Sequence, residues 1–251
     1  MTFDQAEFDL RLEWGIKGVE LLAPISDVII IVDVLSFSTC VDIATSNYAK
    51  IYPYRWKDET ASAYADSLHA ELANFKRSSS NGFSLSPTSL RDIKKDTKLV
   101  LPSPNGATLS LTTGNITTLC GCLRNAKAVA EYAMKIGNRI SIIPAGEQWE
   151  DKSLRPAFED LLGAGAILSF LHGTMSPECK SALSVFLSLK NNLRQELQKC
   201  SSGKELIERG FIDDTLLACD FNISDTVPVL IDNAFVRQLK SSLIGSFEGS
   251  S

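Results

Sequence analysis

The chain has 251 residues, 44% hydrophobic and 22% charged, which is ordinary composition for a globular protein with a sizeable core. Its formal net charge of −5 argues against a nucleic-acid partner, because nucleic-acid-binding proteins present basic surfaces. The sequence contains no run of about 18 apolar residues, the length needed to cross a bilayer. The acidic N-terminal stretch lacks the pattern of a signal peptide. We therefore expect a cytoplasmic protein without nucleic-acid or membrane partners.

Six cysteines are scattered along the chain without a Cys-x-x-Cys pair, and His69 and His172 are the only histidines. Zinc sites need clusters of these ligands, so we expect no zinc and interpret the cysteines as reduced thiols. Any metal in this protein would then be held by oxygen ligands, which favours magnesium.

Two strands are predicted near the N-terminus. Residues 3–15 alternate in part between apolar and polar side chains, which is typical of an edge strand. The run Val28-Ile29-Ile30-Ile31-Val32 is the clearest strand in the chain. A continuous β-branched run indicates burial on both faces, as in a parallel sheet covered by helices.

The second of these strands ends at Asp33, and residues 40–46 read as a helix that Ser38 or Thr39 would cap. Free N–H groups at a helix start attract phosphate or carboxylate, so these three residues are candidates for a binding site. The alternative is that Asp33 only caps the turn and Ser38 only caps the helix.

The next part of the chain alternates again. Residues 50–56 read as a strand in which Pro53 suggests an edge or a bulge. Residues 58–75 are good helix formers with acids in the first turn, and residues 77–89 form a loop rich in Ser, Asn, Gly and Pro.

A second loop of interest follows the strand predicted at residues 97–101. Two prolines stiffen this loop, and Gly106 allows the backbone to approach a ligand. Ser103, Asn105 and Gly106 are therefore candidates for substrate binding, although a rigid turn before a short helix explains the same residues.

A third loop carries a cation. Residues 115–123 predict a strand, and Arg124 comes just before a helix at residues 126–135. An arginine is disfavoured there, because the helix start is already positive. The position suggests an anion partner, though a surface salt bridge would also explain it.

The densest polar stretch follows the apolar run at residues 140–143. Glu147 comes directly after this strand, where ligands bind in open α/β sheets. We expect a helix from about residue 154, on which Arg155 and Glu159 share a face. Asp160 lies about 100° around that helix, so both acids are not expected to serve one ion. The acids and the arginine suggest a site for a metal ion and an anion.

The C-terminal third is mostly helical by pattern. Residues 176–198 predict a long helix with Ser176 as its cap, and shorter helices are expected at residues 204–209 and 213–219. A last short strand is expected at residues 227–231. The whole chain, residues 1–251, reads as a single α/β domain with a flexible tail from about residue 240.

The sequence resembles the 2-phosphosulfolactate phosphatase family over most of its length. The segment around Asn222 to Leu230 contributes to the resemblance. The other matching stretches are VDVLSFSTCVDIA (32–44), PYRWKDE (53–59), LVLPSPNGATLS (99–110), CLRNAKAVA (122–130), AGEQWEDKSLRPAFEDLLGAGAI (145–167) and SGKELIERGF (202–211).

This resemblance implies a three-layer α/β/α fold with a largely parallel or mixed central sheet. It also implies a magnesium-dependent phosphatase that releases phosphate from 2-phospho-3-sulfolactate, a step towards coenzyme M. One position departs from the family, because Ser36 stands where the resemblance implies an arginine after Val-Asp-Val-Leu. The substrate range of this protein can therefore differ from that of the family.

For such a phosphatase we assign Asp33, Glu147 and Asp160 to the magnesium ion. Arg124 and Arg155 would clamp the phosphate or sulfonate, with Asp33 as the third catalytic residue. The hydroxyls and backbone N–H groups of the two loops would bind the remaining oxygens of the substrate. These substrate-binding residues are Ser38, Thr39, Ser103, Asn105 and Gly106.

A rival hypothesis from another class is a non-catalytic binder or sensor of a phosphorylated or sulfonated acid. A dinucleotide-binding domain is disfavoured, because no G-x-G-x-x-G motif follows the first strong strand. A homodimer is the oligomer we expect, since dimers are the commonest assembly of soluble proteins.

Overall fold

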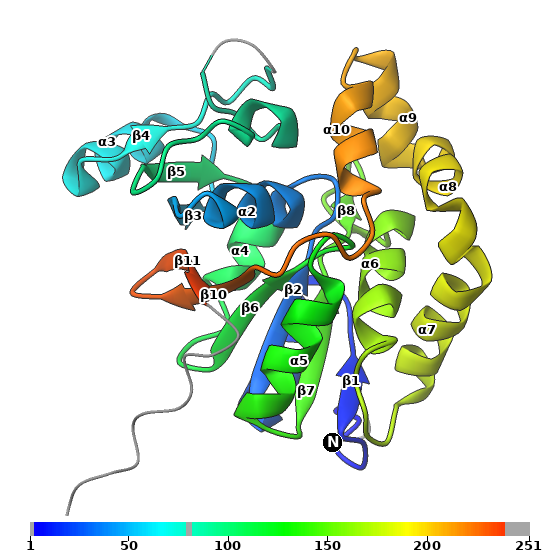
Figure 1. Ribbon diagram of the computed structural model, residues 1–251. Coiled ribbons are helices and arrows are strands. Elements are labelled where there is room, and N and C mark those ends of the chain that lie inside the picture. The colour runs from blue at the N-terminus through cyan, green and yellow to red at the C-terminus, as the bar shows by residue number, and fades with distance from the viewer. Residues whose placement is uncertain (1–2, 79–81, 239–251) are drawn as a thin grey trace, which may run out of the picture.

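In the computed structural model, which describes residues 3–78 and 82–238, one mixed sheet runs through the molecule (Figure 1). Its nine strands follow the order β1-β7-β2-β6-β10-β11-β3-β5-β4. A separate hairpin pairs β8 (Glu147–Gln148) with β9 (Leu154–Arg155). The strands of the sheet are β1 (Leu10–Leu12), β2 (Val28–Val32), β3 (Lys50–Tyr54), β4 (Glu71–Leu72), β5 (Lys98–Pro102), β6 (Thr117–Gly121), β7 (Ile140–Pro144), β10 (Val227–Ile231) and β11 (Ala234–Gln238).

Two parallel blocks make up this sheet. One contains β1, β7, β2 and β6, the other contains β3, β5 and β4, and the β10–β11 hairpin joins them by antiparallel pairing. The backbone N–H of Gly106 donates to Asp33 Oδ2 at 2.8 Å, so the residues that follow β5 meet those that follow β2. The loops after strands of both blocks therefore converge on one place.

Helices cover both faces of the sheet and extend beyond one side of it (Figure 1). Three short 3₁₀ helices, η1 (Ala23–Ile25), η2 (Pro87–Leu90) and η3 (Lys190–Asn192), connect other elements. The α-helices are α1 (Gly15–Leu22), α2 (Phe37–Ser46), α3 (Glu59–Leu68), α4 (Gly106–Ser110), α5 (Ala126–Ile136), α6 (Phe158–Leu168), α7 (Pro177–Leu189), α8 (Leu193–Lys199), α9 (Ser201–Glu208) and α10 (Ile212–Ala218).

Strand β2 shows why three layers form. Ile29 and Ile31 join the apolar cluster of α1 and α4 on one face. Val28, Ile30 and Val32 join the larger cluster of α5, α6 and α7 on the other. All five side chains are fully buried, and burying each contributes roughly 1.5–3 kcal/mol. The predicted α/β fold with a mixed, helix-covered sheet is confirmed.

The prediction that a helix starts at about residue 154 is wrong. Leu154 and Arg155 form β9, and α6 begins only at Phe158. Pro156 accounts for the difference, because a residue that precedes proline is pushed from helical to extended backbone. Arg155 and Glu159 therefore do not share a helix face.

Other boundaries also move. The helix predicted at residues 58–75 ends at Leu68, and the one predicted at residues 176–198 is divided into α7 and α8 by η3. Ser176 does cap α7, since its Oγ accepts from the N–H of Cys179 at 3.2 Å. Helix α2 begins three residues earlier than expected, with Ser36 rather than Ser38 or Thr39 at the N-cap position.

Strand β3 lies inside the sheet, between β11 and β5, so the prediction of an edge at Pro53 is wrong. The proline is tolerated because β11 pairs with β3 only at Phe235 and Ile51. A proline at position 53, which has no N–H, therefore removes no hydrogen bond between these two strands. Strand β1 does lie at an edge, but it spans only three residues.

No helix in the described part of the chain has the length and apolar character needed to span a membrane. The six cysteines are free thiols, five of them buried. The tail expected from about residue 240 lies outside the described residues.

Candidate active site

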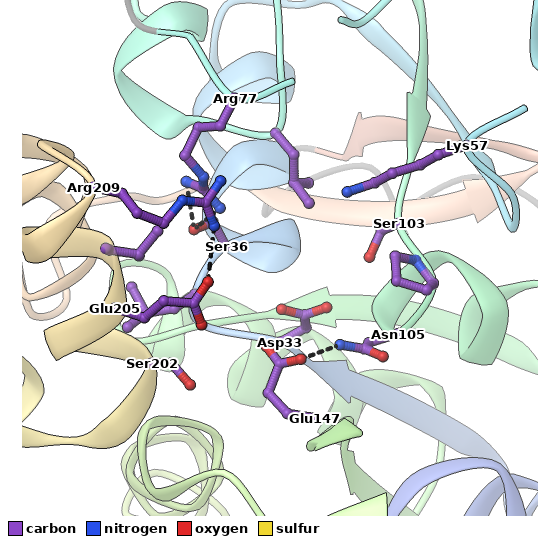
Figure 2. Close-up of a pocket in the computed structure, with 14 residues that line it drawn as sticks. Asp33, Ser36, Lys57, Arg77, Ser103, Asn105, Glu147, Ser202, Glu205 and Arg209 are labelled. Carbon is purple, nitrogen blue, oxygen red and sulfur yellow. Dashed lines mark hydrogen bonds and ion pairs between the residues drawn. The ribbon is translucent and has the colours of Figure 1, made fainter. Parts of the chain in front are cut away.

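A pocket of about 190 Å³ lies where the loops of the two parallel blocks converge (Figure 2). Residues that follow β2, β3, β4, β5 and β7 line it together with residues of α9 and its C-terminal end. One part of its wall carries carboxylates, and another part carries cationic side chains. We call these parts the acidic wall (Asp33, Asn105 and Glu147) and the basic wall (Lys57, Arg77 and Arg209).

Asp33 is the most firmly held residue of the acidic wall. Its Oδ1 accepts from the N–H of Phe37 at 3.2 Å, and its Oδ2 accepts from the N–H of Gly106 at 2.8 Å. Its own N–H donates to Ser38 Oγ at 2.8 Å. The carboxylate is thus fixed between the start of α2 and the start of α4.

Gly106 is required by close approach. A Cβ at this position would lie 2.4 Å from a ring carbon of Phe37 and 2.7 Å from Asp33 Oδ2. The neighbouring Asn105 donates from Nδ2 to Glu147 Oε2 at 2.8 Å. The Pro-Asn-Gly loop therefore holds both carboxylates of the acidic wall, Asp33 through its backbone and Glu147 through a side chain.

Both carboxylates of the acidic wall are poorly solvated. The pKa of Asp33 is raised to about 6, because burial and the charge of Glu159 together outweigh the hydrogen bonds from Gly106 and Phe37, which lower it. The pKa of Glu147 is raised to about 7, chiefly by burial and next by the nearby charge of Asp33. Two adjacent carboxylates that disfavour each other's charge form an environment that a cation would stabilise.

Asp160, which we predicted as a metal ligand, lies behind this wall rather than in it. Its Oδ1 accepts from the N–H of Val34 at 2.7 Å and its Oδ2 from the N–H of Gly146 at 2.9 Å. The side chain therefore ties the loop after β2 to the loop after β7. Burial, followed by repulsion from Asp33, raises its pKa well above the ordinary value.

Glu159 is 2% exposed, and its Oε2 has no hydrogen-bond partner in the described part of the chain. It does not line the pocket, although its charge acts on the pKa values of Asp33 and Glu147. Helix α6 thus places two buried acids beneath the acidic wall.

The basic wall comes from three distant segments. Lys57 follows β3, Arg77 lies in the segment after β4, and Arg209 follows α9. Lys57 points into the pocket near Ser103 in Figure 2. Desolvation lowers the pKa of Lys57, and repulsion from Arg77 and Arg209 lowers it further. Three cations therefore face one small polar volume.

Ser36 lies under the guanidinium of Arg77. Its Oγ accepts from both Nη1 and Nη2 of Arg77 at 3.1 Å (Figure 2). The sequence places a serine where the family resemblance implies an arginine, and in the structure a guanidinium from another segment occupies the adjacent space.

Two of the predicted hydroxyl residues do not reach the pocket. Ser38 and Thr39 are fully buried, and Thr39 Oγ1 donates to the carbonyl of Val34 at 2.8 Å. Both hydroxyls hold the turn that positions Asp33 instead of contacting the cavity. Ser103 does line the pocket and is 2% exposed.

The two predicted arginines are placed differently from each other. Arg124 lies away from this pocket and donates to Asp42 Oδ2 at 2.9 Å and Asp220 Oδ2 at 3.2 Å, which is the salt-bridge alternative. Arg155 lies opposite Glu147 in the β8–β9 hairpin and donates to Ser202 Oγ at 3.2 Å. It stands beside the acidic wall without lining the cavity.

The sequence interpretation missed all three cations of the basic wall. Lys57 and Arg209 lie inside the matching stretches PYRWKDE and SGKELIERGF, so the resemblance contained a signal for both. Arg77 lies outside every matching stretch, in a loop without a regular pattern. Only the fold could bring it to the pocket.

Across residues 3–78 and 82–238, no three His, Cys, Asp or Glu side chains form a group that could by itself hold a metal ion. Asp33 and Glu147 are two carboxylates in one pocket, which is the number Mg²⁺ commonly takes from protein when water and substrate oxygens complete its shell. Their raised pKa values fit a site whose charge a cation completes. The donor set is therefore compatible with magnesium.

Residues 19–233 match the family model described as 2-phosphosulpholactate phosphatase. The chain belongs to this family. A probable 2-phosphosulfolactate phosphatase of Carboxydothermus hydrogenoformans is 30% identical over 208 residues, which cover 80% of this chain and 84% of the relative. A 2-phosphosulfolactate phosphatase of Methanothermobacter thermautotrophicus is 28% identical over 208 residues, 82% of this chain and 88% of the relative. The resemblance seen in the sequence is confirmed.

The position of Asp160 predicts a structural effect. Asp160→Ala leaves the N–H groups of Val34 and Gly146 buried without acceptors, and we expect a loss of roughly 2–4 kcal/mol in the free energy of unfolding. Urea denaturation measures it, with Glu150→Ala on the exposed loop as the control. We expect Mg²⁺ to stabilise the variant as much as the wild type. If the variant is as stable as the wild type without Mg²⁺ but is no longer stabilised by Mg²⁺, Asp160 is a metal ligand instead.

The raised pKa of Glu147 predicts a pH dependence of stability. Below its ordinary pKa of 4.5 the carboxyl is neutral in both states, and as pH rises through about 7 the folded protein must accept a poorly solvated charge. In a chelator, stability should therefore fall between pH 5 and pH 8. Glu147→Gln should reduce that fall by about 1–3 kcal/mol. Urea denaturation at several pH values checks this, and an unchanged pH dependence would show that Glu147 is solvated.

Proposed function

We propose that this protein is a magnesium-dependent phosphatase of 2-phospho-hydroxy acids, with 2-phospho-3-sulfolactate as the substrate and 3-sulfolactate and phosphate as the products. The observation that carries the proposal is the division of one pocket into an acidic wall and a basic wall. A phosphorylated acid needs both, because its phosphoryl group must be activated and its negative charges must be neutralised.

In this proposal Asp33 and Glu147 hold Mg²⁺. When bound, the ion supplies positive charge to the phosphoryl oxygens and orders the water around them. The chain contributes the rigidity of the site, since the N–H groups of Gly106 and Phe37 fix both oxygens of Asp33 and Asn105 fixes Glu147. Phosphoryl transfer depends mostly on such positioning and charge stabilisation.

The chain's own cations then bind the remaining oxygens. Lys57 lies where it can neutralise phosphoryl charge beside the acidic wall, and Ser103 makes no side-chain hydrogen bond with another described residue, so its hydroxyl is available to the substrate. In Figure 2 the two arginines of the basic wall lie on the other side of the pocket from Lys57 and Ser103. A substrate with a phosphate at one end and another acid group at the other fits this order.

Phosphate release from 2-phospho-3-sulfolactate and from phospholactate, with Mg²⁺ and with a chelator, tests the proposal. We expect release with Mg²⁺, and a fall of roughly 100-fold or more with the chelator or in Asp33→Asn, because both remove the charge on which catalysis depends. Asp151→Asn on the exposed loop is the control and should retain wild-type activity.

Each other outcome has a distinct meaning. Phosphate release that is unaffected by the chelator would support the phosphatase activity and contradict its dependence on magnesium. Binding of both compounds without release from either would contradict the phosphatase and support the rival hypothesis of a binder or sensor.

A further inference from the structure

The guanidinium of Arg77 is held from three sides. Nη1 donates to Asp214 Oδ2 at 2.7 Å, both Nη atoms donate to Ser36 Oγ at 3.1 Å, and the group lies 5.6 Å from the centre of the Phe211 ring. Its side chain is only 10% exposed, and that of Asp214 is 1% exposed. Arg77 is therefore a largely buried, fixed cation in the wall of the pocket.

Two donors of this guanidinium are not used. Of its five N–H groups, two on Nη1 and one on Nη2 serve Asp214 and Ser36, whereas Nε–H and the second Nη2–H have no acceptor in the described part of the chain. These two N–H groups are parallel and adjacent. They form the edge with which arginine binds a sulfonate, carboxylate or phosphate through two hydrogen bonds.

Asp214 accounts for the position of this cation. Besides Arg77, it accepts at Oδ1 from Ser86 Oγ at 2.7 Å, from Thr88 N at 3.1 Å and from Thr88 Oγ1 at 2.7 Å. One buried carboxylate on α10 thus fixes Arg77 and the start of η2 together. The segment after β4 is docked on the helical side of the molecule through this residue.

A second guanidinium packs near the same aromatic ring. Arg209 lies 5.9 Å from the centre of the same Phe211 ring and donates to Glu205 Oε1 at 2.8 Å. Both arginines line the pocket, so an anion bound there is attracted by both positive charges. Figure 2 shows both groups across the cavity from the Asn105–Glu147 pair of the acidic wall.

We propose that Arg77 is the residue that selects substrates with an acid group beyond the phosphate and the carboxylate, which it binds through its Nε–Nη2 edge, and that Asp214 is the residue that positions it. This inference rests on the proposed function, in which the phosphoryl group occupies the acidic wall. This additional acid group, the sulfonate in 2-phospho-3-sulfolactate, then lies against Arg77, and Arg209 lines the same pocket. Ser36 belongs to the same arrangement, because a larger side chain there would displace the guanidinium.

Calorimetric binding of 3-sulfolactate and lactate, in the presence of Mg²⁺, tests this without any need for turnover. The two ligands differ only in the sulfonate. We expect wild type to prefer 3-sulfolactate by roughly 10- to 100-fold, the strength of one charge-assisted pair of hydrogen bonds. In Arg77→Met this preference should disappear while lactate binding stays unchanged.

Three further variants keep the test decisive. Arg91→Met removes an exposed arginine near η2 and should retain the preference. Asp214→Asn should weaken 3-sulfolactate binding less than Arg77→Met does, with no change for lactate, because the donor remains but is held less firmly. If Arg77→Met fails to fold because Asp214 is left as an unpaired charge, the double variant Arg77→Met/Asp214→Asn removes both charges and carries the test.

The inference is overturned if wild type shows no preference for 3-sulfolactate, or if folded Arg77→Met or the double variant retains it. This outcome is separate from failure of the proposed function. Phosphate release with an unchanged preference in Arg77→Met would contradict only the role of Arg77. A sulfonate preference that depends on Arg77, without phosphate release from any substrate, would contradict only the phosphatase.

Discussion

The hydrogen bond from the Gly106 N–H to Asp33 is the contact on which the site depends. It joins the loop after β5 to the loop after β2, and so brings the two parallel blocks of the sheet to one pocket. Only glycine allows it, because a Cβ would overlap Phe37 and the carboxylate itself. Asn105, next to this glycine, then holds Glu147, so a single short loop assembles the acidic wall.

The charge distribution follows from that assembly. Asp33 and Glu147 face the cavity, and Glu159 and Asp160 lie buried behind them. Burial raises the pKa of the front pair, and repulsion from Glu159 adds to that shift. Asp160 is tolerated because two backbone N–H groups solvate it. The cations of the basic wall balance this charge across the cavity, and Asp214 fixes one of them. Burial makes these interactions stronger than they would be in water.

The strands and their end residues were predictable, because β-branched runs and the loops that follow them carry local signals. Four residues that were predicted from these signals do line one pocket, namely Asp33, Ser103, Asn105 and Glu147. The role of Arg124 was not predictable, since the partner of a cation, here Asp42, depends on tertiary packing. Arg77 gave no signal, because it reaches the pocket only through contacts with α10. Arg77 places its guanidinium against Ser36, the position at which the family resemblance implies an arginine.

Calorimetric binding of inorganic phosphate with and without Mg²⁺ tests most directly whether the two walls form one site. If both ligands occupy the same pocket, Mg²⁺ should tighten phosphate binding by roughly tenfold or more, and phosphate should tighten Mg²⁺ binding by the same factor, because such coupling is reciprocal. Glu147→Gln should reduce both effects equally. If the affinity for each ligand is the same with and without the other, the account of a single divided pocket is contradicted.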